Sequence, residues 1–254
     1  MSFFRSILDF KRDTVNQREQ RLSQRYNVGA GFPLQATLIL LGPGGKPREL
    51  AGVITDLSIT GANVQLAPDV TAMRGERCSL RLVLGPHNLV IDGTVAHFRA
   101  GPPHASCGLA LRFDEFNTQK AYQQLFETVV LGASLTPAPA ELVRQDAPGE
   151  HKEQYRGDEE AQLTVWRAAP GGAINGFEFR MLNYFARGNK LRPVLEVYSQ
   201  EEVKDEHKAH YPAPALHSLR ERSNEIQQLY AWTVPNLAPV IPADVRAFLG
   251  KFAR

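Results

Sequence analysis

Two short groups of polar residues near the start of the chain have the types and the spacing to bind an anionic nucleotide. Arg21 and Arg25 stand four residues apart in "RLSQR", so they can act together on one helical turn or on a flexible arm. A guanidinium can contact phosphate, fork onto the O6/N7 edge of guanine or stack on a purine, and lysine cannot do all three. These arginines therefore suit a ligand that carries both phosphate and guanine.

The second group is "DLSITG", residues 56–61, inside an otherwise apolar and β-branched run. Asp56 and Ser58 are two residues apart and so share one face of a strand. Gly61 has no Cβ, which lets the backbone bend or lie close to a flat ligand. A carboxylate beside bare backbone suits the N1–H and the exocyclic amine of guanine. Asn63 shares the face of Gly61 and is a further candidate contact.

The segments around these groups alternate in polarity and predict strands separated by turns. They are "LQATLIL", "LAGVITDLSITGANVQL", "RCSLRLVLG", "NLVIDGTVAHFR" and "SCGLALRF". Leu57 and Ile59 should point away from Asp56, into the protein, and the leucines at 80, 82 and 84 share one face. Several short strands without helices between them indicate a small antiparallel barrel, whose closure removes exposed edges.

A helix should follow the last of these strands. The segment "FNTQKAYQQLFETVVL" has an apolar stripe at helical spacing, formed by Phe116, Tyr122, Leu125, Phe126 and Val129. We therefore expect a barrel with one trailing helix.

The two ends of the chain differ from this region. Residues 1–19 predict an amphipathic helix or arm with Phe3, Phe4, Ile7 and Leu8 at helical spacing. Residues 14–33 are polar and rich in arginine, and we expect them to be mobile until a ligand orders them across the surface formed by residues 56–61.

Residues 132–150 are rich in proline and alanine and predict a linker, and residues 151–254 predict a smaller α+β module of unknown role. In this module "EAQLTVWRA" predicts a strand, and the segment that follows predicts a hairpin turning near Gly188 and Asn189. Helices are expected over "LHSLRERSNEIQQLYAW" and "PADVRAFLGKF".

Composition excludes several classes of protein. The chain has 254 residues, 43% hydrophobic and 22% charged, with a net charge of +2, which gives no bulk signal for nucleic acid. Cys78 and Cys107 lie in apolar strand segments and are expected to be reduced in a cytoplasmic protein. No apolar run is long enough to cross a bilayer. The histidines lack metal-ligand spacing, and no phosphate loop or nucleophile elbow is present, so we expect neither a cofactor nor catalysis.

The two polar groups together resemble the signature of the PilZ family, the bacterial receptors for cyclic di-GMP. The family pattern is an R-x-x-x-R arm leading into a six-stranded β-barrel that carries D/N-x-S-x-x-G on its surface. The matching residues are Arg21, Arg25, Asp56, Ser58 and Gly61. The final strand and its helix also look like the family's, so the resemblance covers roughly residues 20–131. The longer "GPGGKPRE" turn departs from the pattern but is easily tolerated by a barrel.

The resemblance implies a mainly β protein with a PilZ-like six-stranded antiparallel barrel, a trailing helix and the additional C-terminal α+β module. It implies that cyclic di-GMP, as one molecule or a stacked pair, binds to Arg21, Arg25, Asp56, Ser58 and Gly61, with Asn63 as a further contact. Such a receptor would relay its signal to an unidentified protein partner through ordering of the arm and through the C-terminal module.

Two alternatives to this receptor remain. A degenerate PilZ protein would act as an adaptor between proteins without binding nucleotide. A small barrel that binds RNA or single-stranded DNA would need aromatic residues interleaved with basic ones, which the first module does not show clearly. A second R-x-x-x-R, at Arg77 and Arg81, follows the acidic motif and is expected on a solvated strand face.

Overall fold

The computed structural model describes residues 24–41, 46–145, 149–200, 216–218 and 223–253. The chain divides into two compact units, Met1–Val129 and Val130–Arg254. The expected amphipathic helix of residues 1–19 lies outside the described residues, and so does Arg21.

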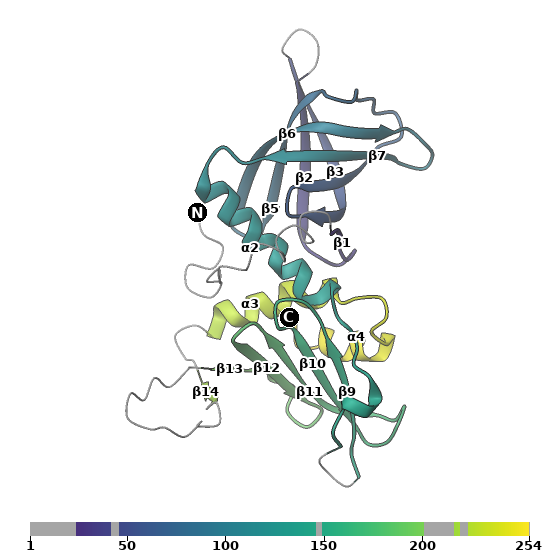
Figure 1. Cartoon of the computed structure of the whole chain (residues 1–254), viewed down its shortest axis with the longest axis vertical. Helices are drawn as coiled ribbons and strands as arrows, with labels where there is room; N and C mark the ends of the chain where they lie inside the picture. The colour runs from purple at the N-terminus through teal and green to yellow at the C-terminus, as the bar shows by residue number, and fades with distance from the viewer. Residues whose placement is uncertain (1–23, 42–45, 146–148, 201–215, 219–222, 254) are drawn as a thin grey trace. The chain divides into compact units, whose positions relative to one another are not determined.

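Six antiparallel strands of the first unit close into a barrel (Figure 1), which confirms the predicted architecture. The order around the barrel is β3-β2-β5-β6-β7-β4, and β4 pairs with β3 to complete it. The strands are β2 (Leu34–Leu41), β3 (Pro47–Ser58), β4 (Gly61–Leu66), β5 (Arg77–Leu84), β6 (His87–Arg99) and β7 (Ala105–Arg112). A two-residue strand, β1 (Tyr26–Asn27), pairs with the end of β3.

The long run that contains the acidic motif forms two strands. β3 ends at Ser58 and β4 begins at Gly61, and these two residues are paired across the turn. Ile59 therefore lies in the turn and is half-buried, and the expectation that it points into the barrel is wrong. The reason is that Ser58 and Gly61 close a tight connection where an uninterrupted strand was expected.

The interior of the barrel is filled by the alternating residues of its strands. Leu80, Leu82 and Leu84 are completely buried, as their spacing predicts. Full burial of such a side chain contributes about 1.5–3 kcal/mol to folding. Cys78 and Cys107 are buried free thiols, as expected.

Helix α2 (Phe116–Ala133) follows the barrel, and most of its predicted stripe is buried. Tyr122, Leu125 and Val129 are completely inaccessible, and Phe126 is nearly so. Phe116 is the exception, because it is 76% exposed. It is the first residue of the helix and precedes the buried positions by more than a turn.

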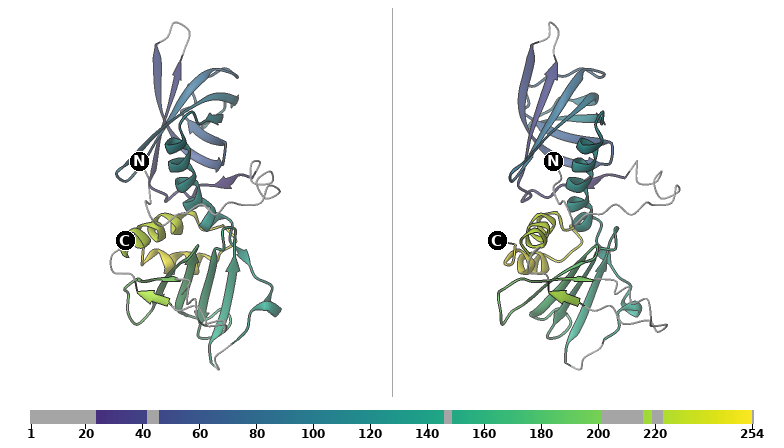
Figure 2. Two further views of the ribbon diagram at one scale, coloured as in Figure 1. Left: turned by 60° about the vertical axis from the view of Figure 1, so that its left-hand side comes forward. Right: turned by 90° about the vertical axis from the view of Figure 1, so that its left-hand side faces the viewer.

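The second unit is built on one antiparallel sheet with the strand order β14-β13-β12-β11-β10-β9-β8. The strands are β8 (Thr136–Pro137), β9 (His151–Arg156), β10 (Gln162–Arg167), β11 (Ile174–Met181), β12 (Tyr184–Asn189), β13 (Glu196–Gln200) and β14 (Leu216–Ser218). Figure 2 shows helices α3 (Ser223–Thr233) and α4 (Ala243–Gly250) on one face of this sheet. The short turn η2 (Val234–Asn236) lies between them in the sequence. Aromatic rings fill the interface, with Phe177 packed against Tyr230, Phe248 and Phe252.

The hairpin turn of this unit differs from the prediction. The chain turns at Leu182 and Asn183, between β11 and β12, and Leu182 has a positive φ of 58°. Gly188 lies inside β12, where a Cβ would be 2.6 Å from the ring of Phe177 and 2.7 Å from that of Phe252. This glycine is therefore required by packing, and the expectation of a turn at residues 188 and 189 is wrong.

Two other segments also differ from their sequence-based interpretation. The beginning of "LHSLRERSNEIQQLYAW" is strand β14, and the described part of the expected helix is α3, Ser223–Thr233. Part of the segment expected to be a linker has regular structure, namely β8 and the 3-10 helix η1 (Ala140–Leu142). β8 pairs with β9, and the side chain of Gln145 accepts from the backbone N–H of Lys152 at 2.8 Å and donates to its carbonyl at 2.9 Å.

Candidate functional site

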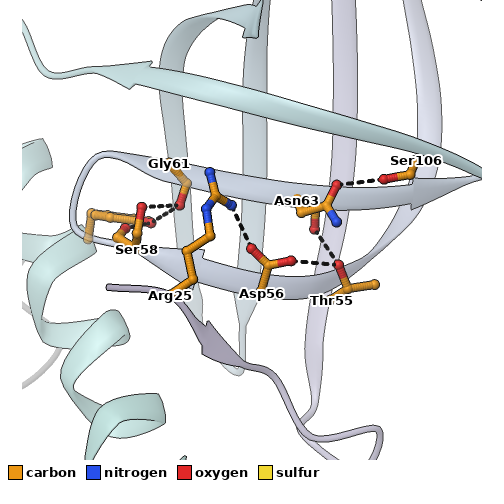
Figure 3. Close-up of polar contacts among 8 residues, drawn as sticks. Arg25, Thr55, Asp56, Ser58, Gly61, Asn63 and Ser106 are labelled. Atoms are coloured by element: carbon orange, nitrogen blue, oxygen red, sulfur yellow. Dashed lines mark hydrogen bonds and ion pairs between the residues drawn. The ribbon is translucent and has the colours of Figure 1, made fainter. Parts of the chain in front are cut away.

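Arg25 of the first predicted group meets Asp56 of the second on the outer surface of the barrel. Arg25 directly precedes β1, and the pairing of β1 with β3 sets Asn27 opposite Asp56. The Nη1 atom of Arg25 donates to Oδ1 of Asp56 at 2.6 Å (Figure 3). Their side chains are 43% and 18% exposed, respectively. A short charge-assisted contact of this kind fixes both groups next to solvent.

A bulge in β3 orients the carboxylate. The β3–β4 register shifts between Ile54 and Asp56, so Thr55 is an extra residue in β3. A bulge of this kind re-aims neighbouring side chains. Here the hydroxyl of Thr55 lies 3.2 Å from Oδ2 of Asp56 and 3.3 Å from the carbonyl of Asn63, and can donate to either. Thr55 therefore lies against the second carboxylate oxygen, while Arg25 donates to the first.

Asn63 lies directly opposite Asp56 in the β3–β4 register. Its Oδ1 accepts a hydrogen bond of 2.9 Å from Ser106 on β7 (Figure 3). This bond fixes which way the amide faces, since the oxygen is directed towards β7. Asn63 thus lies next to the residue that pairs with Arg25.

The turn after β3 supplies the rest of the motif. Ser58 is buried, and its Oγ donates to the carbonyl of Gly61 at 3.4 Å. A Cβ on Gly61 would lie 2.9 Å from the carbonyl of Leu109 and 3.2 Å from Nη2 of Arg25. The absence of a side chain therefore allows the guanidinium to approach the backbone closely. Ser58 stabilises this turn and exposes little surface to a ligand.

Tyr122 of α2 contacts the backbone of the same turn. Its hydroxyl lies 2.7 Å from the carbonyl of Ser58 and 3.1 Å from that of Gly61, and the side chain is completely buried. Burial raises the pKa of this phenol, so it remains a neutral donor. Sequence reasoning assigned Tyr122 only to the apolar stripe, and it missed Thr55 and Ser106 altogether.

The second R-x-x-x-R lies elsewhere on the barrel. Arg81 on β5 forms a 3.5 Å ion pair with Glu49 on β3, and both side chains are exposed. This geometry is that of a solvated strand face, as expected. Arg21, the other predicted arginine of the site, lies outside the described residues.

In the described part of the chain, no group of three or more His, Cys, Asp or Glu side chains could hold a metal ion. No helix in the same residues has both the length and the apolar character to span a bilayer.

Comparison with known proteins identifies the first unit. Residues 18–130 match the family model of the PilZ domain, so this part of the chain is a PilZ domain. Comparison with curated protein sequences found no match.

Two solved structures are remotely similar. One is the PilZ domain with c-di-GMP of YcgR from Escherichia coli, with 13% identity, a TM-score of 0.33, and coverage of 41% of this chain and 86% of that chain. The other is the Borreliella burgdorferi PlzA protein in complex with c-di-GMP, with 9% identity, a TM-score of 0.31, and coverage of 94% and 97%. The assignment to the family comes from the match to the family model.

Proposed function

We propose that this protein is a receptor for cyclic di-GMP, which it binds on the barrel surface around Asp56. The observation that carries the proposal is the pairing of Arg25 with Asp56 beside the bare backbone of Gly61. A cation for phosphate and a carboxylate for the guanine N1–H and amine are thus adjacent. The PilZ family match supports the same ligand class.

Binding requires Arg25 and Asp56 to exchange partners. In the complex, the guanidinium of Arg25 contacts the phosphates and the Hoogsteen edge of guanine. The carboxylate of Asp56 accepts hydrogen bonds from the Watson–Crick edge. An exposed ion pair contributes only about 0–1 kcal/mol. We expect the exchange to be favourable, because each charge gives up one partner and gains more than one charge-assisted hydrogen bond from the ligand.

The relay in this proposal begins in the arm. Tyr26 and Asn27 pair with β3, so the proposal concerns the residues of the arm that precede this strand. We propose that residues 14–23, with Arg21, become ordered over the bound nucleotide and pass the signal to a protein partner. Hydrogen exchange should show increased protection of residues 14–23 on addition of cyclic di-GMP. Unchanged exchange there would contradict the arm-based relay and leave the binding proposal intact.

Calorimetry with cyclic di-GMP tests the binding proposal. We expect Arg25→Ala to weaken binding at least about tenfold, because charge-assisted contacts to the ligand are lost. Arg81→Ala is the matched control, since it also removes an exposed arginine of an ion pair on the barrel, and it should bind like the wild type. The stoichiometry distinguishes one nucleotide from a stacked pair.

The same titration can reject the proposal. If the folded wild type does not bind cyclic di-GMP, the receptor function is wrong and the degenerate adaptor becomes the better explanation. If Arg25→Ala and Arg81→Ala weaken binding equally, the ligand lies elsewhere.

A further inference from the structure

Both halves of the candidate site rest on the same face of α2. Tyr122 hydrogen-bonds to the carbonyls of Ser58 and Gly61, which are the two ends of the turn in the acidic motif. These are the last residue of β3 and the first of β4, so one hydroxyl holds the hairpin that carries Asp56.

The arginine half is held one helical turn further along. Tyr26, which directly follows Arg25, packs edge-on against Phe126 with 5.8 Å between ring centroids. Phe126 in turn lies parallel to Tyr122 at 6.4 Å. Both separations fall in the range of favourable aromatic pairs. The backbone of Arg25 and the backbone around Asp56 are thus positioned by two neighbouring side chains of α2.

The far end of α2 belongs to the second unit. The helix continues past Val129 to Ala133. The carbonyl of Gly132 accepts a hydrogen bond of 3.1 Å from the N–H of Ala238. A Cβ on Gly132 would lie 2.7 Å from the carbonyl of Thr233, so the backbone of α2 is packed directly against that of α3. One continuous helix therefore contacts the candidate site near its middle and the second unit at its end.

We infer that Tyr122 is a positioning residue of the nucleotide site and the point at which that site is coupled to the second unit through α2. This inference rests on the proposed binding of cyclic di-GMP. Exchange of partners at Asp56 displaces the hairpin, and the hydroxyl of Tyr122, which donates its one proton between the carbonyls of Ser58 and Gly61, transmits that displacement to the helix. The last turn of α2 then changes its packing within the second unit, which is the kind of small helix shift that carries signals in many switches.

The test combines calorimetry with hydrogen exchange on the full chain and uses Tyr122→Phe, which keeps the ring and removes only the hydroxyl. The matched control is Tyr230→Phe. Tyr230 is also completely buried and also donates to a backbone carbonyl, that of Leu249 at 3.0 Å, but in the second unit. Both variants should lose similar thermal stability, because each loses one buried hydrogen bond.

The two variants should differ in how they respond to cyclic di-GMP. In the wild type the nucleotide should alter exchange of the Ala238 amide and of the Ser134 amide, which is bonded to Val130. Tyr122→Phe should bind about 3- to 10-fold more weakly, as expected for one lost hydrogen bond, and this remote change should disappear. Tyr230→Phe should keep both the affinity and the ligand-induced change.

Each alternative outcome is decisive. If Tyr122→Phe binds cyclic di-GMP with wild-type affinity and still shows the ligand-induced change at Ala238 and Ser134, the inference is wrong, while the proposed function stands. Equal losses of affinity in both variants would show that Tyr122 has only a structural role, and this result would also overturn the inference. If the folded wild type does not bind cyclic di-GMP, the proposed function itself fails, which is a different result.

Discussion

The guanidinium of Arg25 and the carboxylate of Asp56 lie 2.6 Å apart, although 31 positions separate the two residues in the sequence. The short strand β1 creates this contact by pairing beside β3. The pair places a positive and a negative charge side by side at the surface of a PilZ domain. In the proposed complex the guanidinium binds phosphate and the carboxylate binds guanine.

Asp56 should determine which base is bound. Its carboxylate accepts from the N1–H and the 2-amino group of guanine, whereas adenine presents an acceptor at N1 and lacks the amine. Cyclic di-AMP would therefore meet repulsion in addition to missing bonds. We expect the wild type to prefer cyclic di-GMP at least about tenfold, and Asp56→Asn to lose most of this preference.

Competition calorimetry with both dinucleotides measures this preference. Asp92→Asn is a suitable control, because Asp92 is an exposed barrel carboxylate bonded to Ser79 at 2.7 Å. Comparable affinities of the wild type for the two dinucleotides would contradict the role of Asp56.

Gly61 should tolerate no side chain. In Gly61→Ala the new Cβ would approach the carbonyl of Leu109 to 2.9 Å and Arg25 Nη2 to 3.2 Å. We expect the free energy of unfolding to fall by about 1–3 kcal/mol, as for other overpacking substitutions, and the affinity for cyclic di-GMP to fall with it.

Urea denaturation and calorimetry check the two effects of Gly61→Ala. Gly250→Ala is the control, since no atom lies within 4 Å of a Cβ built there at the end of α4. That change should be neutral or stabilising by up to about 1 kcal/mol. The clash argument fails if Gly61→Ala is as stable as Gly250→Ala.

A buried arginine in the second unit should make its stability sensitive to acid. Arg167 is only 3% exposed and donates to Glu153 at 2.8 Å and to Asp244 in the first turn of α4 at 2.5 Å. The hydrogen bond from Arg167 lowers the pKa of Asp244 below its ordinary value of 3.8. The folded pKa is thus below the unfolded one, so this stabilisation is complete above the unfolded pKa and is lost as the pH falls through the folded pKa.

Asp244→Asn should therefore lower the free energy of unfolding near neutral pH and make little difference in strong acid. We expect a loss of about 1 kcal/mol, because the Asp244 side chain is 56% exposed and solvent screens the pair. Denaturation curves between neutral pH and about pH 2 give the comparison. Asp114→Asn, in an exposed pair with Arg112, should show no such dependence, and a constant difference for Asp244→Asn at every pH would exclude the proposed linkage.

The two thiols should be inert in the folded protein. Burial raises the pKa of Cys78 to about 12 and that of Cys107 to about 11, so little thiolate exists at neutral pH. A thiol-reactive dye should modify neither cysteine at pH 8 and should modify both in denaturant. Rapid labelling without denaturant would show that the barrel opens locally.

Much of the first unit is predictable because its signals are local. Alternation identifies the strands, and the leucines of β5 are buried as their period of two requires. The acidic motif is also visible at this level, because a carboxylate and a glycine in an apolar run stand out in the sequence itself. The β3–β4 turn is less visible, since Ile59 has no turn propensity.

The residues that support the site are not predictable in the same way. Tyr122 contacts backbone carbonyls, which carry no side-chain identity, so nothing in the sequence pairs it with residues 58 and 61. Thr55 acts through a bulge that exists only once β3 and β4 are in register. Gly188 gave a wrong prediction because glycine is typical of turns. In this protein it is needed inside a strand, where a side chain would clash with the ring of Phe252.

The segment between α2 and β9 also protects the second unit from aggregation. An unpaired edge of β9 would present a row of backbone donors and acceptors, which is a template for intermolecular β-sheet. β8 covers the end of that edge with two residues, one of them Pro137, which has no N–H to offer. Gln145 occupies both backbone groups of Lys152 with its own amide. The proline- and alanine-rich segment thus forms the edge of the sheet on this side. It leaves fewer free backbone groups with which a strand of a second molecule could pair.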